Sequence, residues 1–421
     1  MKAPKRGFFM KKEKELIPHL FRTEYSKITA VLGRLFGFEN IEIAEDIVSD
    51  TFMLAAETWG QKGLPDNPVA WLYAVSKNKA KDYLKRNQIF YDKIAIDIKN
   101  NSSEAYEIDI DLSGKNIIDS QLQMMFAICN PLISAEGQIG LSLRILCGFS
   151  IEEIAAAFLS NKETINKRLY RAKEKLRAEQ VKIEFPKLTE IDSRLDTVLT
   201  TLYLLFNEGY YSASQNIALR RDLCLEAMRL TYLLGDNEIT NQPAVNALLA
   251  LMCFHASRFE ARIGQHGESV IYDDQDTLLW DNELIARGQY YLNMASIGSK
   301  ISKYHLEAAI AHLHTNKVSS DDKWENILQL YNTLLLIEYS PIAALNRTYA
   351  LSKTAGKIIA VTEAEKLDLT GNYLYHCLLG YLYTDLDNTL AITNFKIAYK
   401  LAKAGSEKAK IEEYIRQLNG S

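Results

Sequence analysis

The sequence predicts an all-α protein, and three observations support this fold class. The chain of 421 residues contains only 8 prolines and 20 glycines, so few positions break a helix. Long stretches are rich in Ala, Leu, Ile, Glu and Lys, a composition that favours helix over sheet. In the best-defined segments apolar residues recur three and four positions apart, as they do on one face of a helix. The length suggests about two to four domains.

The overall charge limits how the protein can meet nucleic acid. The net charge is −4, and residues 1–180 carry 26 Lys and Arg against 24 Asp and Glu. A protein that coats DNA without sequence preference would be far more basic, because neutralisation of phosphates supplies such binding. Any DNA contact must therefore be local, or assisted by a partner.

Neither a membrane span nor a disulfide framework is expected. No apolar run reaches the ~18–20 residues that cross a bilayer, and the basic N-terminus lacks the apolar core of a secretory signal. The five cysteines are scattered and form no CxxC pair. We expect reduced, mostly buried thiols in a cytoplasmic protein that has no zinc site and no membrane partner.

Residues 12–93 are predicted to be helical, and an acidic helix at 40–60 is their first distinctive part. This segment, NIEIAEDIVSDTFMLAAETWG, holds five acids and no base. Glu42, Asp46 and Asp50 fall four apart on one exposed face, where like charges repel by ~0.2–0.5 kcal/mol per pair. The face either awaits a basic partner or only keeps the protein soluble. The stripe expected to be buried consists of Ala44, Ile47, Val48, Phe52, Ala55, Ala56 and Trp59.

A basic helix with aromatic residues follows in NPVAWLYAVSKNKAKDYLKRN, at 67–87. Pro68 suits the first turn of a helix. Trp71 and Tyr73 either stack on bases of melted nucleic acid or belong to the core, and we favour the core for Trp71. The cations of this helix are Lys77, Lys79, Lys81, Lys85 and Arg86.

The helical pattern breaks at residues 94–119. This segment carries six acids against two lysines together with an Asn-Asn-Ser-Ser cluster, which predicts a flexible acidic linker. The pattern returns at 120–180. Pro186 marks a second boundary, after which helix is predicted from about 190 to the end.

Two helices and a short turn are predicted in GFSIEEIAAAFLSNKETINKRLYRAKEKLR, at 148–177. Ser150 with Glu153, and Ser160 with Glu163, both fit the capping-box pattern, so helices should begin near 150 and 160. A turn of three to four residues would then join them.

The second of these helices has an apolar face and a basic one. Ile165, Leu169, Ala172 and Leu176 lie four, three and four apart and should be buried together. Two helices, a short turn and an outward basic face predict a helix-turn-helix whose second helix reaches base edges with its N-terminal residues. The alternative is an amphipathic hairpin with a solvated basic face. The cations expected at phosphates are Arg168, Arg171, Lys173, Lys175 and Arg177.

Together, the acidic helix, the aromatic and basic helix, the acidic linker and the helix-turn-helix resemble the sigma-70 family of bacterial sigma factors. The resemblance covers about residues 12–180 and is strongest to the extracytoplasmic-function class. AEDIVSDTFMLAAETW (44–59) is similar to region 2.2, which docks on the β′ clamp helices of core RNA polymerase. Ser49 stands where the family usually has Gln. The polymerase-binding residues that the resemblance implies are Glu45, Asp46, Ser49 and Asp50.

The same resemblance implies two surfaces that bind promoter DNA. NPVAWLYAVSKNKAKDYLKR is similar to regions 2.3–2.4, which melt and read the −10 element, and residues 120–177 resemble region 4, which reads the −35 element and meets the polymerase β flap. The family's turn often reads Leu-Gly-Ile-Ser, whereas FLSNKET has no glycine. The first surface would use Lys77, Asn78, Lys81, Lys85 and Arg86. The second would use Lys162, Glu163, Thr164, Asn166, Lys167, Arg168 and Arg171.

The rest of the chain resembles the large helical C-terminal extension of one sigma subgroup, which is similar to tetratricopeptide repeats. In FNEGYYSAS, Asn207 and Glu208 either ring a small-ligand pocket or bond the loop after a helix that Gly209 ends. We favour the second interpretation. The repeat's small-aromatic-Ala-aromatic-Ala order is approached by Gly380, Tyr383, Ala391, Phe395 and Ala398.

No catalytic or metal-binding pattern emerges from the spacings. His305 and His312 share a helix face, but no carboxylate or cysteine completes a metal site. The acids of DDQDTLLWD are expected to cap a helix rather than bind a cation. We find no nucleophile beside a base and no phosphate loop, so we expect no enzyme and no cofactor.

The preferred hypothesis is a sigma factor that binds core RNA polymerase and promoter DNA. The alternative is a stand-alone helix-turn-helix regulator with a ligand- or protein-sensing helical domain, which would leave the acidic helix without a task. A scaffold of helical repeats is a third class. For the tail, contact with polymerase, contact with DNA, masking of region 2 or region 4, and ligand sensing all remain open.

The predicted parts are region 2 at 1–93, the linker at 94–119, region 4 at 120–180 and the helical extension at 190–421.

Overall fold

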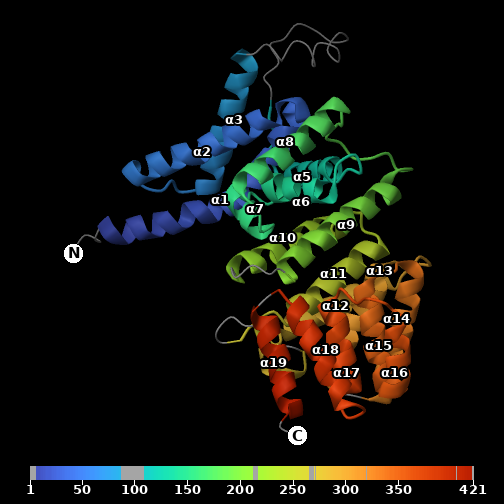
Figure 1. Ribbon diagram of the computed structural model, residues 1–421. Coiled ribbons are helices and arrows are strands. Elements are labelled where there is room, and N and C mark those ends of the chain that lie inside the picture. The colour runs from blue at the N-terminus through green and yellow to red at the C-terminus, as the bar shows by residue number, and fades with distance from the viewer. Residues whose placement is uncertain are drawn as a thin grey trace. The chain divides into compact units, whose positions relative to one another are not determined.

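The protein is all-helical, as predicted, and it divides into two compact units (Figure 1). The structure, a computed structural model, describes residues 6–86, 109–211, 217–264, 270, 272–318, 320–403 and 405–419. Across these ranges there are 18 α-helices and no β-strand. Unit 1 comprises Met1–Ser214 with Leu219–Leu233, and unit 2 comprises Gln215–Ala218 with Leu234–Ser421.

Unit 1 is built around its first helix. In chain order the unit holds α1 (Arg6–Phe36), the 3-10 turn η1 (Phe38–Asn40), α2 (Ile41–Lys62), α3 (Pro68–Arg86), α5 (Gly114–Ile128), α6 (Ala135–Leu141), the π-helical turn η2 (Ser142–Leu146), α7 (Ile151–Ala157), α8 (Lys162–Ala178), α9 (Ile191–Tyr210) and most of α10 (Ile217–Gly235).

Helix α1 packs against helices of both domains predicted for the N-terminal part, region 2 at 1–93 and region 4 at 120–180. It contacts α2, α3 and η1, which precede residue 87, and α5 and η2, which follow residue 108. Tyr25, Ile28 and Leu32 are fully buried in these contacts. A Cβ on Gly33 would lie 2.7 Å from both the Ile41 and Met124 side chains, so α1 approaches α2 and α5 closely at this point. The described helices before 87 and after 109 therefore share one core.

The structure differs from the predicted linker in its last residues. Helix α5 begins at Gly114, and the Asp111 carboxylate fixes the preceding turn by accepting a hydrogen bond from the Ser113 backbone N–H at 2.8 Å. The acidic composition therefore continues into a helix. Residues 94–108 of the predicted linker lie outside the described residues.

The start of the predicted C-terminal extension belongs to unit 1. Helix α9 contacts α5 and α6, and the Thr201 hydroxyl donates a hydrogen bond of 2.6 Å to the buried Gln138 side chain. In α10, Arg229 donates to the backbone carbonyl of Leu146 at 2.7 Å. The predicted domain from 190 onward is thus divided between the two units.

Unit 2 is a row of helices in which successive members pack together, as α14 to α19 show (Figure 1). Two acids of DDQDTLLWD cap helices, as expected: Asp281 accepts from the Leu284 backbone N–H, and Asp276 accepts from that of Leu278. Its elements are α11 (Pro243–Ala256), η3 (Glu260–Arg262), η4 (Tyr272–Asp274), η5 (Thr277–Leu279), α12 (Asn282–Ala295), α13 (Lys303–Leu313), α14 (Asp321–Ile337), α15 (Pro341–Thr354), α16 (Lys357–Glu365), α17 (Tyr373–Tyr383), α18 (Asn388–Leu401) and α19 (Gly405–Asn419).

The small and aromatic positions noted near the C-terminus pack as a helix pair. A Cβ on Gly380 would lie 2.7 Å from the Phe395 ring, so α17 and α18 approach closely where the side chain is absent. Ala391, Phe395 and Ala398 are buried. Tyr383 is half-buried and its hydroxyl donates to Glu365 at 2.6 Å. These contacts fit the packing expected from the repeat-like order.

Gly209 allows α9 and α10 to touch, which is a different role from the helix end proposed for it. The helix continues to Tyr210, and a Cβ on Gly209 would lie 2.5 Å from the backbone carbonyl oxygen of Arg220 and 2.8 Å from the sulfur of Cys224. Since a backbone oxygen cannot rotate away, any side chain here must push the two helices apart.

We predict that Gly209→Ala lowers the free energy of unfolding by about 1–3 kcal/mol, the usual result of overpacking. Gly60→Ala is the matched control, because Gly60 also lies in a helix but a Cβ there meets nothing within 4 Å. It should raise stability by up to about 0.5–1 kcal/mol, since alanine favours helix over glycine. Urea denaturation of the full chain, followed by circular dichroism, compares the two. Equal effects of both substitutions would contradict the close approach.

Candidate functional site

The first helix of the pair at 151–178, α7, begins where the sequence predicts. The Ser150 hydroxyl accepts from the Glu153 backbone N–H at 3.2 Å, and the Glu153 carboxylate accepts from the Ser150 backbone N–H at 2.8 Å. This reciprocal capping box confirms the start of α7. Glu153 also receives Arg22 of α1 at 2.6 Å, so the cap is attached to the first helix of the unit.

The second predicted capping box is wrong by one residue. Helix α8 is capped by Asn161, whose side chain accepts from the Thr164 backbone N–H at 2.8 Å. Glu163, expected to close a box with Ser160, instead pairs with Lys167 at 2.6 Å. Asparagine caps a helix at least as well as serine, so the neighbouring residue takes the position.

The turn between the two helices holds Leu159 in a left-handed conformation, with φ at 47°. The side chain is 68% exposed, so nothing buries it there. A left-handed leucine costs about 1–2 kcal/mol, and backbone hydrogen bonds from Leu159 to Ala156 and from Ser160 to Ala155 hold the turn.

The N-terminal half of α8 presents its polar residues to solvent. The buried face holds the four predicted residues, Ile165, Leu169, Ala172 and Leu176, together with Lys173. Arg168 is half-buried and its guanidinium lies 5.2 Å from the centre of the Phe158 ring. The exposed members of the predicted DNA-binding set are Lys162, Glu163, Thr164, Asn166, Lys167 and Arg171.

The C-terminal half of α8 does not face outward as predicted, because two of its cations bind the acidic helix α2. Lys173 is only 9% exposed and forms an ion pair with Glu45, which is 6% exposed. Arg177 pairs with Glu42 at 2.6 Å. Arg144, on η2, donates to Glu45 at 3.0 Å. We call these five residues the α2–α8 ion cluster.

This cluster answers part of the question raised by the acidic helix. A carboxylate removed from water needs a partner, and Glu45 has two cations. Burial, and then the negative charge of Glu45, raise the pKa of the Tyr25 hydroxyl beside it. The basic surface that meets the inner acids of α2 therefore lies within the same unit.

The outer acids of α2 stay accessible. Asp46 and Asp50 are exposed, and Asp50 lies 3.4 Å from Lys79 of α3. Ser49 donates its hydroxyl hydrogen bond to the Glu45 backbone carbonyl at 2.8 Å, as a polar residue does inside a helix. Of the four predicted polymerase-binding residues, Asp46 and Asp50 thus form an open surface and Glu45 does not.

On α3 the predicted DNA-binding residues lie along the surface. Asn78, Lys85 and Arg86 are exposed, and Lys81 is half-buried. Lys77 is also half-buried and forms an ion pair with Asp109. The hydrogen bond and charge of that lysine lower the pKa of the Asp109 carboxyl.

The aromatic residues upstream on α3 pack into the unit. The Trp71 ring lies edge-on to the buried Trp59, with ring centres 5.3 Å apart. The Tyr73 hydroxyl donates to Glu24 at 2.6 Å, and burial with this hydrogen bond raises the pKa of Tyr73. Both contacts favour the core interpretation over base stacking.

Several contacts in unit 1 could not be found in the sequence. Arg22 and Arg144 drew no attention there, yet Arg22 pairs with Glu153 across 131 positions and lies 4.0 Å from the centre of the Phe149 ring. Glu45 and Arg144 are 99 positions apart. Nothing local in the chain marks such pairs.

In unit 2, His305, one of the two histidines considered for a metal site, has another role. His305 bonds Ser302 through Nδ1, at 3.1 Å from the backbone nitrogen, and its Nε2 lies 3.2 Å from the carbonyl oxygen of Ala295. It therefore caps α13. Over the residues that the structure describes, no three His, Cys, Asp or Glu side chains gather as a metal site would require.

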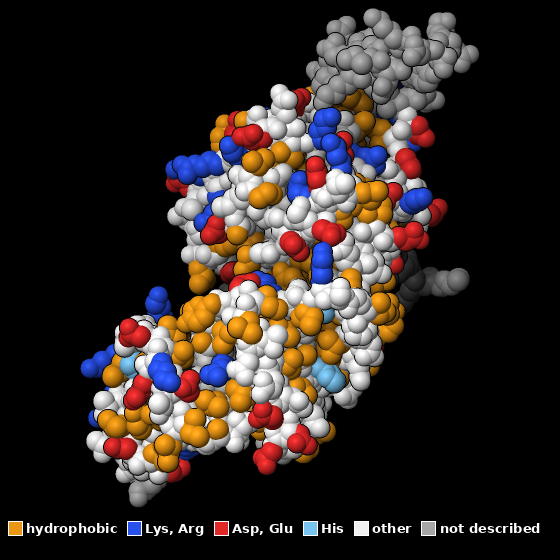
Figure 2. Space-filling model, turned by 90° about the vertical axis from the view of Figure 1, so that its right-hand side faces the viewer, with side chains coloured by type: hydrophobic (Ala, Val, Ile, Leu, Met, Phe, Trp, Pro, Cys, Tyr) orange, Lys and Arg blue, Asp and Glu red, His pale blue; other side chains and the backbone are white. Residues whose placement is uncertain are grey.

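The protein's surface charge is mixed. On the face drawn in Figure 2, Lys and Arg side chains are interspersed with Asp and Glu. None of the described helices combines the length and hydropathy needed to cross a bilayer.

Comparison with known proteins defines the class. Residues 20–89 match the model for sigma-70 region 2, and residues 194–296 match a family of unknown function. The first match spans α1 to α3, the helices that carry the exposed acids and cations described above. The match supports a sigma-70 family member over residues 20–89.

A relative extends the similarity along the whole chain. The chain is 33% identical over 389 residues to an uncharacterized protein of Rhizobium meliloti (strain 1021), which covers 90% of this chain and 91% of that protein. The chain belongs to the same family as this Rhizobium protein. No solved structure matches it.

We predict that Glu45→Ala lowers the free energy of unfolding by up to about 3–5 kcal/mol, because Lys173 and Arg144 would both lose this carboxylate and Lys173 would keep only Glu42, at 3.5 Å. Asp46→Ala, one position along the same helix and exposed, should change it by no more than about 0.5 kcal/mol. Replacing Glu45 and Lys173 together by leucine and methionine should recover most of the loss. Chemical denaturation measures all three. If Glu45→Ala behaves like Asp46→Ala, the cluster does not hold unit 1 together.

Proposed function

We propose that the chain is a sigma factor of the extracytoplasmic-function class, which binds core RNA polymerase and directs it to promoters in the cytoplasm. The observation that carries this proposal is the sigma-70 region 2 match over residues 20–89. The geometry supports it, since acidic and basic surfaces occupy two adjacent helices of that domain, at Asp46 and Asp50 on α2 and at Asn78, Lys85 and Arg86 on α3.

In this proposal the outer face of α2 docks on the β′ clamp helices. Asp46 and Asp50 supply the charge, and Ser49 lies between them. Glu45 contributes indirectly, because its side chain is engaged by Lys173 and Arg144. Polymerase would provide most of the grip on DNA, which fits a chain whose net charge is −4.

Two helices would read the promoter. The cations and the amide of α3 would meet the melted −10 element, and the exposed N-terminal half of α8 would enter the major groove at the −35 element, with region 4 on the β flap. Exposure of Asn166, Lys167 and Arg171 suits this task, because base edges are read by the N-terminal residues of a recognition helix.

Reading both elements requires unit 1 to open. The −35 and −10 elements are roughly 25 base pairs apart, or about 85 Å of duplex at ~3.4 Å per base pair. A compact body of roughly 230 residues, like unit 1, has a radius of gyration of about 17 Å and spans about half that length. The α2–α8 ion cluster must therefore break before α3 and α8 reach their elements together.

We propose that the repeat-like helical extension, similar to tetratricopeptide repeats, regulates or assists this step.

The proposal is tested by transcription in vitro. The purified chain should bind core polymerase and direct start-site choice on promoters that it selects from a randomised library. A chain that neither binds core nor changes start sites is no sigma factor.

We predict that Asp46→Lys combined with Asp50→Lys weakens binding to core polymerase by about tenfold or more, since two attractive charges become repulsive. The control is Asp236→Lys with Glu238→Lys, two exposed acids of unit 2 whose change alters net charge equally. Fluorescence anisotropy of labelled protein gives the affinities, and circular dichroism checks the fold. Equal affinities of the two double variants would contradict docking through α2.

We predict that Lys167→Ala combined with Arg171→Ala weakens promoter binding by the holoenzyme and removes its preference at the −35 element. Each lost phosphate contact should also lower the slope of log affinity against log salt by roughly 1. Lys366→Ala with Arg287→Ala is the control, because it removes two exposed cations of unit 2, outside every predicted DNA-binding set. Core binding should not change in either variant. A −35 preference that survives the first double substitution would contradict the role of α8.

A further inference from the structure

Unit 2 contains a cavity of about 350 Å³ to which the sigma role assigns nothing. Its walls come from the turn after α11, from η4 and from α13 to α15. This volume is at the lower end of the range for small-molecule sites. The lining residues that matter are Arg258, Tyr272, His314, Trp324, Asn346 and Tyr349.

The cavity holds a buried cation, Arg258, that has no acidic partner among the residues that the structure describes. Arg258 is only 8% exposed, and its Nε has no hydrogen-bond acceptor. Among the described residues no carboxylate lies within ion-pair distance of it. Its guanidinium instead lies 5.4 Å from the ring centre of Tyr272 and 6.0 Å from that of Trp280. Ring contacts cover the face of a guanidinium and leave its N–H groups to receive an anion.

The surroundings strengthen the positive character of the site. None of the residues that line the cavity is acidic. Burial, followed by the charges of Arg258 and Lys323, lowers the pKa of His314 to about 4, so this ring is neutral at physiological pH. Its buried Nδ1 also has no hydrogen-bond partner. The cavity therefore presents two buried polar groups that a ligand could satisfy.

The remaining walls are aromatic and continuous. The Tyr272 and His314 rings are 5.1 Å apart, those of His314 and Trp324 are 5.9 Å apart, and those of Trp324 and Tyr349 are 5.6 Å apart. Such walls suit a flat apolar body, which packs against aromatic rings by offset or edge contacts. Asn346, which is exposed, lies at the opening.

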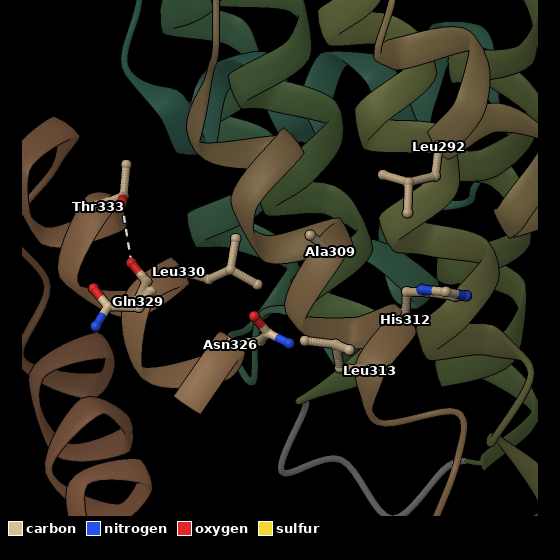
Figure 3. Close-up of a pocket in the computed structure, with 8 residues that line it drawn as sticks. All are labelled: Leu292, Ala309, His312, Leu313, Asn326, Gln329, Leu330 and Thr333. Carbon is tan, nitrogen blue, oxygen red and sulfur yellow. Dashed lines mark hydrogen bonds between the residues drawn. The ribbon is translucent and has the colours of Figure 1, made fainter. Parts of the chain in front are cut away.

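A neighbouring cavity of similar volume lacks the buried charge found in the cavity around Arg258. The pocket in Figure 3, of about 370 Å³, lies among α12, α13 and α14. Its labelled residues are apolar or neutral, and the Thr333 hydroxyl is already bonded to the Gln329 carbonyl at 3.0 Å. It offers no buried charge, so nothing there selects a ligand by charge.

We propose that the cavity around Arg258 binds a small organic carboxylate with a planar apolar body. The carboxylate accepts hydrogen bonds from the Arg258 guanidinium, and the body lies against Trp324 and Tyr349. Charged hydrogen bonds in a dry site fix the orientation of such a ligand, and the aromatic walls set its width. This inference does not rest on the sigma function, because binding to unit 2 can be measured without polymerase or DNA.

The test is calorimetric titration of the full-length chain with phenylacetate and benzoate. Phenylacetamide, which has the same shape without the charge, and inorganic phosphate, which has charge without a ring, are the comparisons. We expect millimolar or tighter binding of at least one carboxylate. Phenylacetamide and phosphate should each bind at least about tenfold more weakly, the usual loss when a charged hydrogen-bonded pair is removed.

Two variants locate the binding. Arg258→Gln should weaken carboxylate binding by at least about tenfold, while Arg287→Gln, an exposed arginine of α12 paired with Glu283, should not change it. Asn346→Trp fills the opening from an exposed position and should also block binding, even if Arg258→Gln fails to fold.

The inference is overturned by any of three results. Neither carboxylate binds at millimolar concentration; or binding survives both Arg258→Gln and Asn346→Trp; or phosphate binds as tightly as the carboxylates, in which case the site takes inorganic anions only.

Discussion

Unit 1 depends on the carboxylate of Glu45, which is buried between Arg144 and Lys173. These three residues come from α2, η2 and α8. One buried carboxylate therefore links a helix that precedes residue 87 with two elements that follow residue 108. A buried ion pair adds little net stability but is expensive to break from one side. The cluster therefore fixes which faces of α2 and α8 meet more than it strengthens their contact.

The α2–α8 ion cluster divides the charged residues of α2, and likewise those of α8, into an inner surface that is paired within unit 1 and an outer surface that is exposed. The inner acids of α2, Glu42 and Glu45, hold α8, while Asp46 and Asp50 remain exposed. Likewise Lys173 and Arg177, in the C-terminal half of α8, are used within unit 1, and its N-terminal half stays open. A partner that binds the outer surfaces can thus attach without first breaking the cluster. In the proposed function, opening would follow, driven by the additional contacts that an extended arrangement would make with polymerase and two promoter elements.

Local patterns in the sequence predicted local structure well. The capping box at Ser150 and the apolar face of α8 depend on residues within a few positions of each other. The orientation of Lys173 and Arg177 could not be predicted in this way, because a cation on a helix has the same local pattern whether it faces DNA or a carboxylate 128 to 135 positions away. Arg258 was missed for the same reason. Its environment is assembled from residues between 258 and 349, and no spacing marks an unpaired charge.

Arg258 is also the point at which stability and binding in unit 2 are linked. A buried cation without a carboxylate makes the unliganded fold less favourable than a neutral residue would, so a ligand that neutralises it stabilises unit 2 by mass action, by about 2.7 kcal/mol at a concentration one hundred times its Kd. Stabilisation alone does not regulate transcription, because a ligand shifts an equilibrium only if it binds two states with different affinity. A carboxylate on Arg258 would therefore control promoter use only if the cavity between Tyr272 and Tyr349 differs between the closed and the polymerase-bound chain. If the cavity is the same in both, the ligand would stabilise unit 2 and leave transcription unchanged.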